Sequence, residues 1–270
     1  MQPRLGFGAS ALVPRAGGAK PSAVIDKTHI LLLAGSFEAR SLAEAMTARG
    51  LQYDAWITEP PRGSAPMPVT PQLRRFDRAK DMQQAIGQGG YRAVLDASHV
   101  FDRLATKQAF AAAKTMNLPY LRIERPAWAT TGHPKTTSAK DVRTATAMIG
   151  EGARVFAATG WDSLPDYANF KGEVLMLRQT RRHPRPAPYP FVELAFGDPP
   201  FSIDDEKELF ASHKIDTLVC RNLGSSASGM KVDAAQALGL HVILIDRPAL
   251  PQGLEMVTHA ADGIAWALNL

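Results

Sequence analysis

The stretch TLVCRNLGSSASGMKVDAAQALGLHVILIDRP, residues 217–248, decides the fold class. An apolar run from Thr217 to Cys220 leads into a loop of small residues, and a helical segment follows and ends at Gly239. A second apolar run then spans Val242 to Ile245. A strand, a tight turn, a helix and a strand within about 30 residues are typical of a βαβ unit with parallel strands. We therefore predict a parallel α/β sheet in this half of the chain.

The loop inside this unit is rich in hydrogen-bonding side chains. Asn222, Ser225, Ser226 and Ser228 follow the first strand and precede the helix. Ligands of open α/β sheets bind at the carboxyl ends of the strands, and a helix N-terminus favours anions there. The loop has a second interpretation, in which its residues are small only because the chain must turn tightly. The sequence leaves both open.

The same alternation of strands and helices fills the rest of the chain. Strands are expected at 29–34, 53–58, 93–97 and 119–123, with helices at 37–49, 81–87 and 106–117 between them. After Arg125-Pro126 the pattern restarts, with a helix at 141–149, strands at 154–158, 173–178 and 191–196, a helix from Ser202 to His213, and a last helix that Thr258 caps. We expect two tandem α/β domains, 29–126 and 127–270, with a site in the cleft between them. Residues 1–28, rich in Ala, Gly and Pro with scattered cations, are expected to form a disordered basic arm.

Composition excludes several classes of protein. An apolar content of 45% in 270 residues suits a folded core, and no apolar run is long enough to span a membrane. The single cysteine, Cys220, lies in a predicted buried strand and is expected to be a core residue. The seven histidines have no metal-ligand spacing, and no GxSxG motif is present. We therefore expect no metal site.

The net charge of +5 is concentrated in two groups of cations. One group contains Arg178, Arg181, Arg182, His183 and Arg185, and the other Arg74, Arg75, Arg78 and Lys80. Neither stretch has aromatic residues between its cations, so the pattern of a single-strand nucleic-acid site is absent. Each group is either a solvated surface or a site for a carboxylate-rich ligand, since arginine binds carboxylates through two hydrogen bonds.

Two strand ends in the first half carry candidate site residues. The turn Gly35-Ser36 precedes a helix N-terminus that could bind a phosphate, although it lacks the GxGxxG pattern. Asp96, Ser98 and His99 follow the third strand. His99 either exchanges a proton with a ligand or bonds to the backbone at the strand end. Trp128 and Trp161 pack either in the core or on a flat ligand.

Four segments, in order, resemble landmarks of the precorrin-6A reductases, enzymes of cobalamin biosynthesis. They are LLLAGSFEARSLAEAMTARG (31–50), VLDASH (94–99), LRIERPAW (121–128) and residues 216–248. The resemblance spans residues 29–270. It implies two Rossmann-like domains, each a mostly parallel sheet flanked by helices, with the site in the cleft between them. It also implies reduction of one double bond of the tetrapyrrole precorrin-6A by NADPH, which gives precorrin-6B.

The resemblance also implies roles for particular residues. Gly35, Ser36 and Glu38 would lie near NADPH. Where the segment 74–80 departs from the family's pattern, we hypothesise that Arg62, Arg74 and Arg75 instead bind its 2′-phosphate. His99 would deliver the proton. The tetrapyrrole would be bound by Ser98, Asn222, Ser225, Ser226 and Lys231.

Two other functions stay open at this stage. The stretch Arg74–Lys80 has no glycine where the family carries them, so the chain could instead be a paralogue that binds a tetrapyrrole and no longer reduces it. The substrate could also be the cobalt-containing ring of the anaerobic branch. A nucleic-acid partner would rest on charge alone, and we predict none. We expect a cytoplasmic protein.

Overall fold

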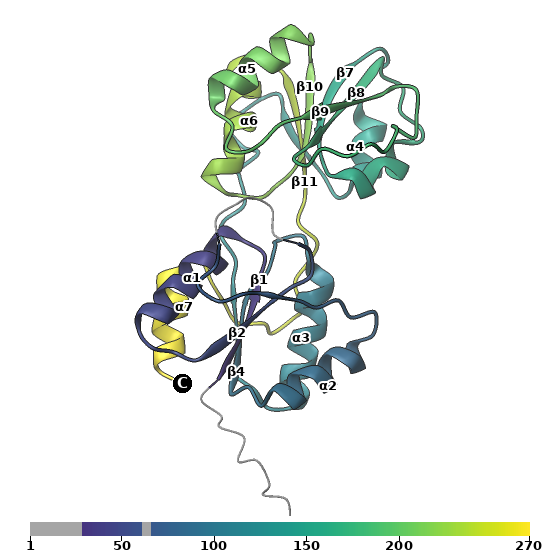
Figure 1. The fold of residues 1–270 in the computed structure, drawn as a ribbon. Helices are drawn as coiled ribbons and strands as arrows, with labels where there is room; N and C mark the ends of the chain where they lie inside the picture. The colour runs from purple at the N-terminus through teal and green to yellow at the C-terminus, as the bar shows by residue number, and fades with distance from the viewer. Residues whose placement is uncertain (1–28, 61–65) are drawn as a thin grey trace, which may run out of the picture.

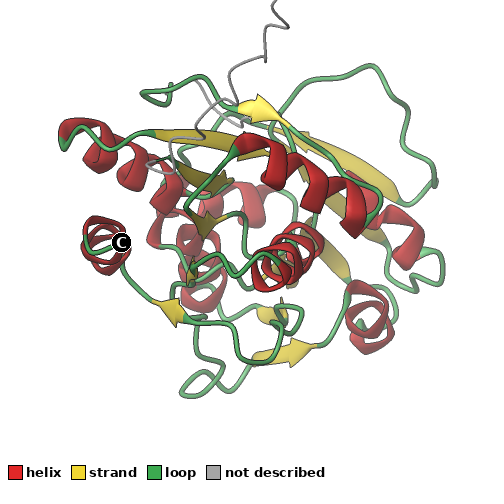
Figure 2. Ribbon diagram, turned by 90° about the horizontal axis from the view of Figure 1, so that it is seen from below, coloured by secondary structure: helices red, strands yellow, loops and turns green. Residues whose placement is uncertain are grey.

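The structure is a computed structural model that describes residues 29–60 and 66–270. Over these residues the chain forms two α/β domains, one above the other in Figure 1. Each has a central sheet with helices on both faces (Figure 2). The expectations for the arm 1–28 and for Arg62 concern residues outside the described ranges.

The first sheet has six parallel strands in the order β12-β5-β4-β1-β2-β3. This corresponds to the Rossmann order, 3-2-1-4-5-6 read from the other edge. β1 at its centre is apolar throughout, and β4 and β5 beside it are apolar except for Asp96 and Arg122, as expected of strands that are covered by helices on both faces. The strands are β1 (Ile30–Ala34), β2 (Tyr53–Ile57), β3 (Gln72–Leu73), β4 (Ala93–Ala97), β5 (Tyr120–Ile123) and β12 (Met256–Val257).

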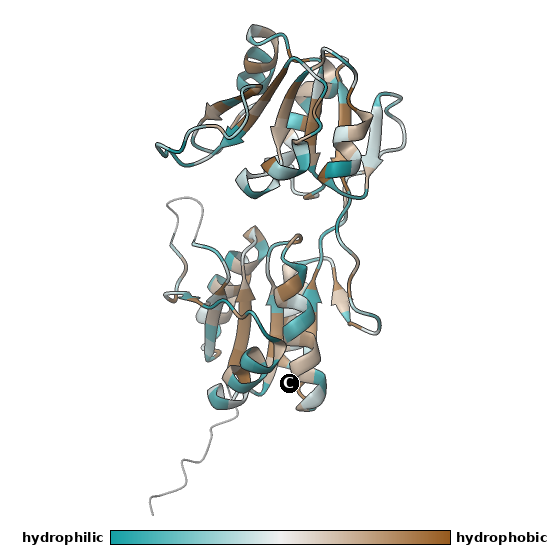
Figure 3. Cartoon of the chain, turned by 90° about the vertical axis from the view of Figure 1, so that its right-hand side faces the viewer, coloured by the Kyte–Doolittle hydropathy of each residue, from teal (hydrophilic) through white to brown (hydrophobic). Residues whose placement is uncertain are grey.

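Four helices cover this sheet, two on each face. α1 (Phe37–Ala48) and α7 (Ala260–Leu268) lie together on one face, and α2 (Ala79–Gly89) and α3 (Arg103–Thr115) lie on the other (Figure 1). Ser36 begins α1 as its N-cap, because its hydroxyl accepts the Ala39 N–H at 3.2 Å. The two pairs of helices bury the sheet between two apolar layers. Its strands appear brown in the interior in Figure 3.

The C-terminal segment returns to the first domain, so the expected division into 29–126 and 127–270 was wrong in its last part. Met256 pairs with Arg122 at the edge of the first sheet, and α7 buries Ile264 and Ala267 against its core. β12 has only two residues and leaves no recognisable pattern in the sequence. The N-cap of α7 is His259 rather than Thr258. The chain therefore crosses between the domains twice.

The second sheet also has six parallel strands, in the order β6-β11-β10-β7-β8-β9. It contains the predicted βαβ unit as β10, α6 and β11, and the predicted N-cap Ser202, which forms a capping box with Asp205. Its elements are β6 (Thr136–Ala139), α4 (Val142–Met148), β7 (Arg154–Ala158), the 3-10 helix η1 (Trp161–Tyr167), β8 (Val174–Gln179), β9 (Val192–Phe196), α5 (Ile203–Ser212), β10 (Thr217–Arg221), α6 (Ser226–Ala237) and β11 (His241–Ile245).

Each sheet reverses its strand order at one point. In the first sheet the reversal lies between β1 and β4, and in the second it lies between β7 and β10. Ligands of open α/β sheets bind in the crevice outside the carboxyl ends of the strands at such a point. The fold therefore offers two crevices, one in each domain.

We predict that Ile264→Ala destabilises the first domain by about 2–5 kcal/mol, because the truncation leaves a cavity between α7 and the sheet. Urea denaturation followed by circular dichroism measures the loss. Leu268→Ala, in the same helix, removes a side chain that is 51% exposed and should change stability little. Equal effects of the two variants would contradict the packing of α7 on the first sheet.

Candidate functional site

The two crevices open into one cleft. Its volume is about 1430 Å³, and its wall contains loops from both domains. Those of the first domain follow β1, β2, β4 and β5, and those of the second follow β7 and β10. Pockets for one drug-sized ligand have about 300–1000 Å³, so this cleft has room for more than one such ligand. A smaller hollow of about 310 Å³ beside Lys114 and Leu118 lies at the opposite edge of the first sheet, where β5 begins.

The turn after β1 lies directly against the loop after β4. Ser36 donates its hydroxyl to the Ala97 carbonyl at 2.8 Å. A Cβ placed on Gly35 would lie 2.9 Å from the His99 nitrogen, so only glycine permits this approach without a shift of the chain. Gly35, Ser36 and His99 all line the cleft.

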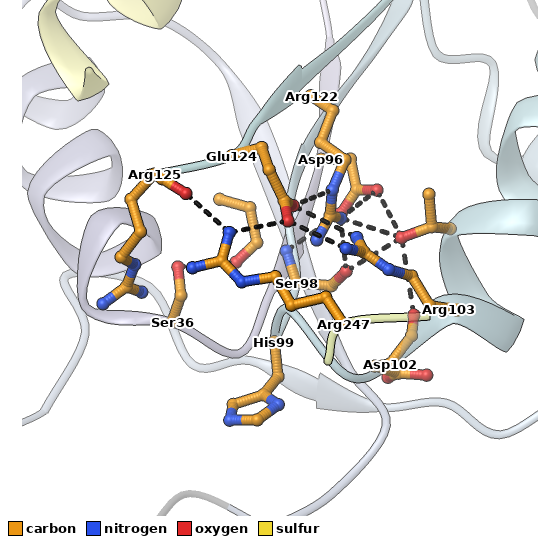
Figure 4. A network of polar contacts seen from close by, with 12 residues as sticks. Ser36, Asp96, Ser98, His99, Asp102, Arg103, Arg122, Glu124, Arg125 and Arg247 are labelled. Carbon is orange, nitrogen blue, oxygen red and sulfur yellow. Dashed lines mark hydrogen bonds and ion pairs between the residues drawn. The ribbon is translucent and has the colours of Figure 1, made fainter. Parts of the chain in front are cut away.

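His99 lies at the point where the first sheet reverses its strand order. Its Nδ1 accepts the Phe101 N–H at 3.2 Å, which places the proton of the neutral ring on Nε2. Figure 4 shows the imidazole pointing away from the buried ionic groups around Arg122. Phe101 then reaches the second domain, where its ring lies 5.4 Å from the guanidinium carbon of Arg221.

A cation from the segment after β3 lies beside the end of β2 at the cleft. The Arg75 Nε donates to the Thr58 carbonyl at 2.6 Å, and both residues line the cleft. Arg74 points elsewhere, because its guanidinium lies 5.3 Å from the Trp56 ring centroid and bonds to Gln72. The structure therefore separates the two arginines that the sequence grouped.

Glu38 is in the first turn of α1 and forms an ion pair with Arg125. Both side chains are largely buried and both residues line the cleft. Arg125 belongs to the first crossing between the domains, so this pair joins α1 to that crossing. The helix N-terminus thus already has a carboxylate close to it.

In the second domain, the serine-rich loop after β10 forms part of the cleft wall. Ser225 caps α6 by accepting the Ser228 N–H at 3.2 Å, and the Ser226 side chain is exposed. Ser225, Ser226, Ser228 and Arg221 all line the cleft. Gly160, at the end of β7, lies beside Arg221, since a Cβ on it would be 3.7 Å from the Arg221 Nη2.

Three residues expected to bind the tetrapyrrole have their side chains committed elsewhere. Asn222 is buried and makes two hydrogen bonds with the Trp128 backbone, at 2.8 and 3.0 Å. Lys231 donates to the Ser228 carbonyl inside its own helix, and burial lowers its pKa. Ser98 is buried and accepts the Arg122 Nη1. None of the three lines the cleft, because each side chain points into its domain or onto the linker.

Beneath the first crevice lies a buried ionic network (Figure 4). Arg122 and Asp96 are both 0% exposed, and their ion pair is 2.7 Å long. Asp96 also accepts the hydroxyls of Thr106 at 2.8 Å and Tyr120 at 2.7 Å. Glu124 accepts from three arginines, namely Arg103 at 2.8 Å, Arg122 at 2.7 Å and Arg247 at 3.0 Å.

These partners keep both carboxylates ionised. Burial alone would raise the pKa of Asp96, but the Arg122 charge and the hydrogen bonds from Tyr120 and Ser98 outweigh it and lower the pKa below its usual value. Burial would likewise raise the pKa of Glu124, and Arg103 and Arg122 lower it instead. Stabilisation by the network is therefore present above the ordinary carboxyl pKa of about 4 and is lost as the pH falls further.

Arg247 joins the two crossings between the domains. It lies in the second crossing and donates to the carbonyls of Arg125 at 2.6 Å and Pro126 at 3.2 Å in the first. It also donates to the Leu223 carbonyl at 3.0 Å. Gly224 adopts φ +70°, and a Cβ there would lie 1.9 Å from the Pro126 oxygen. The domain junction is thus packed against the loop that begins the second crevice.

The cleft wall also presents apolar side chains to solvent. Phe37 is 71% exposed and Leu104 is 59% exposed, the highest values among the large apolar residues of the described chain. They belong to the first turns of α1 and α3, which follow the two strands at the reversal point. Both line the cleft. Exposed apolar side chains that gather at one cleft indicate a ligand with an apolar face.

Sequence reasoning missed the network and these apolar residues. Arg122 and Glu124 stand in or beside a predicted buried strand, and a charge in such a place requires a partner, so that signal was available. The exposure of Phe37 left no sequence signal. Among the described residues, no cluster of three or more histidine, cysteine or acidic side chains could hold a metal ion. In the same ranges, no helix has the length and hydropathy needed to cross a bilayer.

Comparison with known proteins identifies the family. The family model described as "Precorrin-6x reductase CbiJ/CobK" matches residues 29–267. The chain belongs to this precorrin-6x reductase family. Its curated relatives include the precorrin-6A reductase of Rhodococcus erythropolis, with 31% identity over 90% of this chain and 98% of the relative. They also include that of Rhodobacter capsulatus, with 30% identity over 83% and 90%.

A solved structure agrees with this assignment to the precorrin-6x reductase family. The structure titled "CobK precorrin-6A reductase" superposes with a TM-score of 0.81 at 27% identity, over 90% of this chain and 96% of that one. The match confirms the α/β fold with two parallel sheets flanked by helices. The chain is therefore an oxidoreductase of the precorrin-6x reductase type.

We predict that Arg122→Met destabilises the protein by about 3–5 kcal/mol at pH 7, since it leaves two buried carboxylates without their shared partner. The difference from wild type should narrow as the pH falls below ~4, where the carboxyls become protonated first in the unfolded chain and then, at lower pH, in the folded wild type. Chemical denaturation at pH 7 and below pH ~4 measures the free energy of unfolding of the variant and of wild type. The control is Arg143→Ala, which removes an exposed ion pair with Asp166. A difference independent of pH would contradict the role of these charges.

Proposed function

We propose that this protein reduces one double bond of precorrin-6A to give precorrin-6B, with NADPH as the hydride donor. The main support for the proposal is the single cleft. It is formed at the points where the strand order of the two parallel sheets reverses, one sheet in each domain. Such a cleft lets a cofactor in one crevice face a substrate held from the other. Relatives named precorrin-6A reductase are 29–31% identical to this chain, and those named cobalt-precorrin-6A reductase 24–28%, which favours the metal-free substrate.

The residues of the first crevice fit a dinucleotide with a 2′-phosphate. In Rossmann-like domains the end of the second strand lies beside the adenine ribose, where an acidic residue favours NAD and an arginine favours NADP. Here Arg75, from the segment after β3, reaches that strand end with its side chain and donates to the Thr58 carbonyl. The turn Gly35-Ser36 would then lie under the pyrophosphate, at the α1 N-terminus. When bound, the nicotinamide supplies the hydride.

The remaining wall suits the macrocycle. Phe37 and Leu104 present apolar surface to a flat ring, and Ser225 and Ser226 present hydroxyl and backbone groups from the other domain. Catalysis would come from holding the ring against the nicotinamide and from a proton delivered to the neighbouring carbon. His99 stands at the crevice with its Nε2 as the proton-bearing atom, and we assign it this delivery. NADPH is an intracellular reductant, so we place the reaction in the cytoplasm.

The direct test is to mix purified protein, precorrin-6A and NADPH and to follow the absorbance of the macrocycle and of the nicotinamide together. We expect one NADPH oxidised for each macrocycle converted. A perturbed macrocycle spectrum with no NADPH oxidation would instead identify a tetrapyrrole-binding paralogue that has lost the reaction.

Arg75→Ala should raise the KM for NADPH about tenfold or more, because a hydrogen-bonded charge pair contributes about 1.5–3 kcal/mol. The KM for NADH should not change, since NADH has no 2′-phosphate. Arg74→Ala is the matched control and should leave both values unchanged. An equal loss with both cofactors, or in both variants, would remove Arg75 from the phosphate site.

His99→Ala should lower kcat about 100-fold or more with little change in KM, as expected for the loss of a positioned proton donor. His259→Ala is the control, because that histidine also lines the cleft. Steady-state kinetics at several pH values makes the comparison. An unchanged kcat in His99→Ala would show that another group or an ordered water delivers the proton.

A further inference from the structure

The arginine-rich segment after β8 carries side chains that stack on aromatic rings from neighbouring strands. Trp161 follows β7, His183 follows β8, and Phe196 ends β9. The ring centroids of Trp161 and His183 are 4.8 Å apart, and those of His183 and Phe196 are 5.5 Å apart. These three rings therefore form a row along the carboxyl ends of three adjacent strands.

An arginine lies on each end of this row. The Arg185 guanidinium carbon is 5.7 Å from the Trp161 centroid, and that of Arg182 is 5.6 Å from the Phe196 centroid. We call these five residues the arginine–aromatic row. Both arginines are exposed, and within residues 29–60 and 66–270 neither forms an ion pair with a carboxylate. Stacking holds the face of a guanidinium and leaves its N–H edge directed outward for a bidentate carboxylate.

The row begins at the wall of the cleft. In the sequence, Trp161 lies between Gly160 and Asp162. Gly160 packs beside Arg221, and both Arg221 and Asp162 line the cleft. The cleft wall itself carries both signs of charge, since Glu38, Glu59, Asp77, Asp102 and Asp162 accompany its arginines. The cleft alone is therefore poorly matched to a polyanion, and the row adds unpaired cations at its edge.

We propose that Arg182 and Arg185 form a carboxylate-binding subsite that holds the peripheral acidic side chains of the macrocycle while its ring lies in the cleft. The proposal rests on the proposed function, because it assigns the rim of the same substrate. The sequence alone could not show it, since the rings that hold the arginines come from other strands. It assigns Arg182 and Arg185 to ligand binding rather than to a merely solvated surface, whereas Arg178 of the same group forms a largely buried ion pair with Glu206.

The test is the double variant Arg182→Ala/Arg185→Ala. Precorrin-6A is titrated into the protein without NADPH, and its absorbance is followed at low and at moderate salt. We expect the Kd to rise about tenfold or more, which corresponds to 1.4 kcal/mol or more, and its dependence on salt to weaken. The KM for NADPH and the kcat at saturating macrocycle should stay close to wild type. Arg182→Lys/Arg185→Lys should restore part of the affinity, because it keeps the charge and loses the planar fork.

The control is Arg49→Ala/Arg143→Ala, which removes the same charge from exposed residues outside the cleft wall. An unchanged Kd in the test variant, or an equal rise in the control, would overturn the subsite. The titration also separates this proposal from the proposed function. If wild type binds precorrin-6A and oxidises no NADPH, reductase activity fails while the subsite is still tested by binding. If wild type does not bind precorrin-6A, both fail.

Discussion

The arrangement of the site depends on the ion pair between Arg122 and Asp96. Both groups are fully buried at the carboxyl ends of adjacent strands, directly beneath the crevice of the first sheet. Removing ions from water is costly, and the cost is offset here by two carboxylates and several hydroxyls around one guanidinium. The Ser98 hydroxyl accepts a hydrogen bond from Arg122, and this bond fixes the direction in which the chain leaves β4. His99 is the next residue and therefore lies at the cleft.

The network also connects the chemistry to the domain junction. Glu124 shares its carboxylate between Arg122 in the sheet, Arg103 at the start of α3 and Arg247 in the second crossing. Arg103 in turn donates to the Pro248 carbonyl at 2.7 Å. Arg247, which pairs with Glu124, also donates to the Leu223 carbonyl in a loop of the second domain. The two crevices thus face each other across a junction held by the hydrogen bonds of Arg247 and Arg103.

Much of the fold was predictable, and the reasons are visible in particular elements. β10, α6 and β11 have lengths and apolar patterns that few other folds produce, and the turn residues mark their ends. β3 and β12 have two residues each, so their pairing depends on neighbours distant in the sequence. The return of α7 to the first domain was unpredictable because its packing also depends on residues distant in the sequence.

The candidate site was predictable at the level of strand ends and less so at the level of side chains. Asn222 and Ser98 have suitable chemistry and stand at the correct edges, yet both turn inward because Trp128 and Arg122 need their hydrogen bonds. Arg74 and Arg75 are adjacent in the sequence and point to different surroundings. Which of two neighbouring residues meets a ligand is decided by tertiary contacts that a linear pattern does not contain.

The most direct test of this account is a crystal structure of the protein with NADP⁺ and the reduced macrocycle. We predict that the nicotinamide lies beside Gly35 and His99, and that the macrocycle lies between it and the Arg221 side of the cleft. Ligands bound outside this cleft, or a macrocycle separated from the nicotinamide by the Phe101 loop, would contradict it.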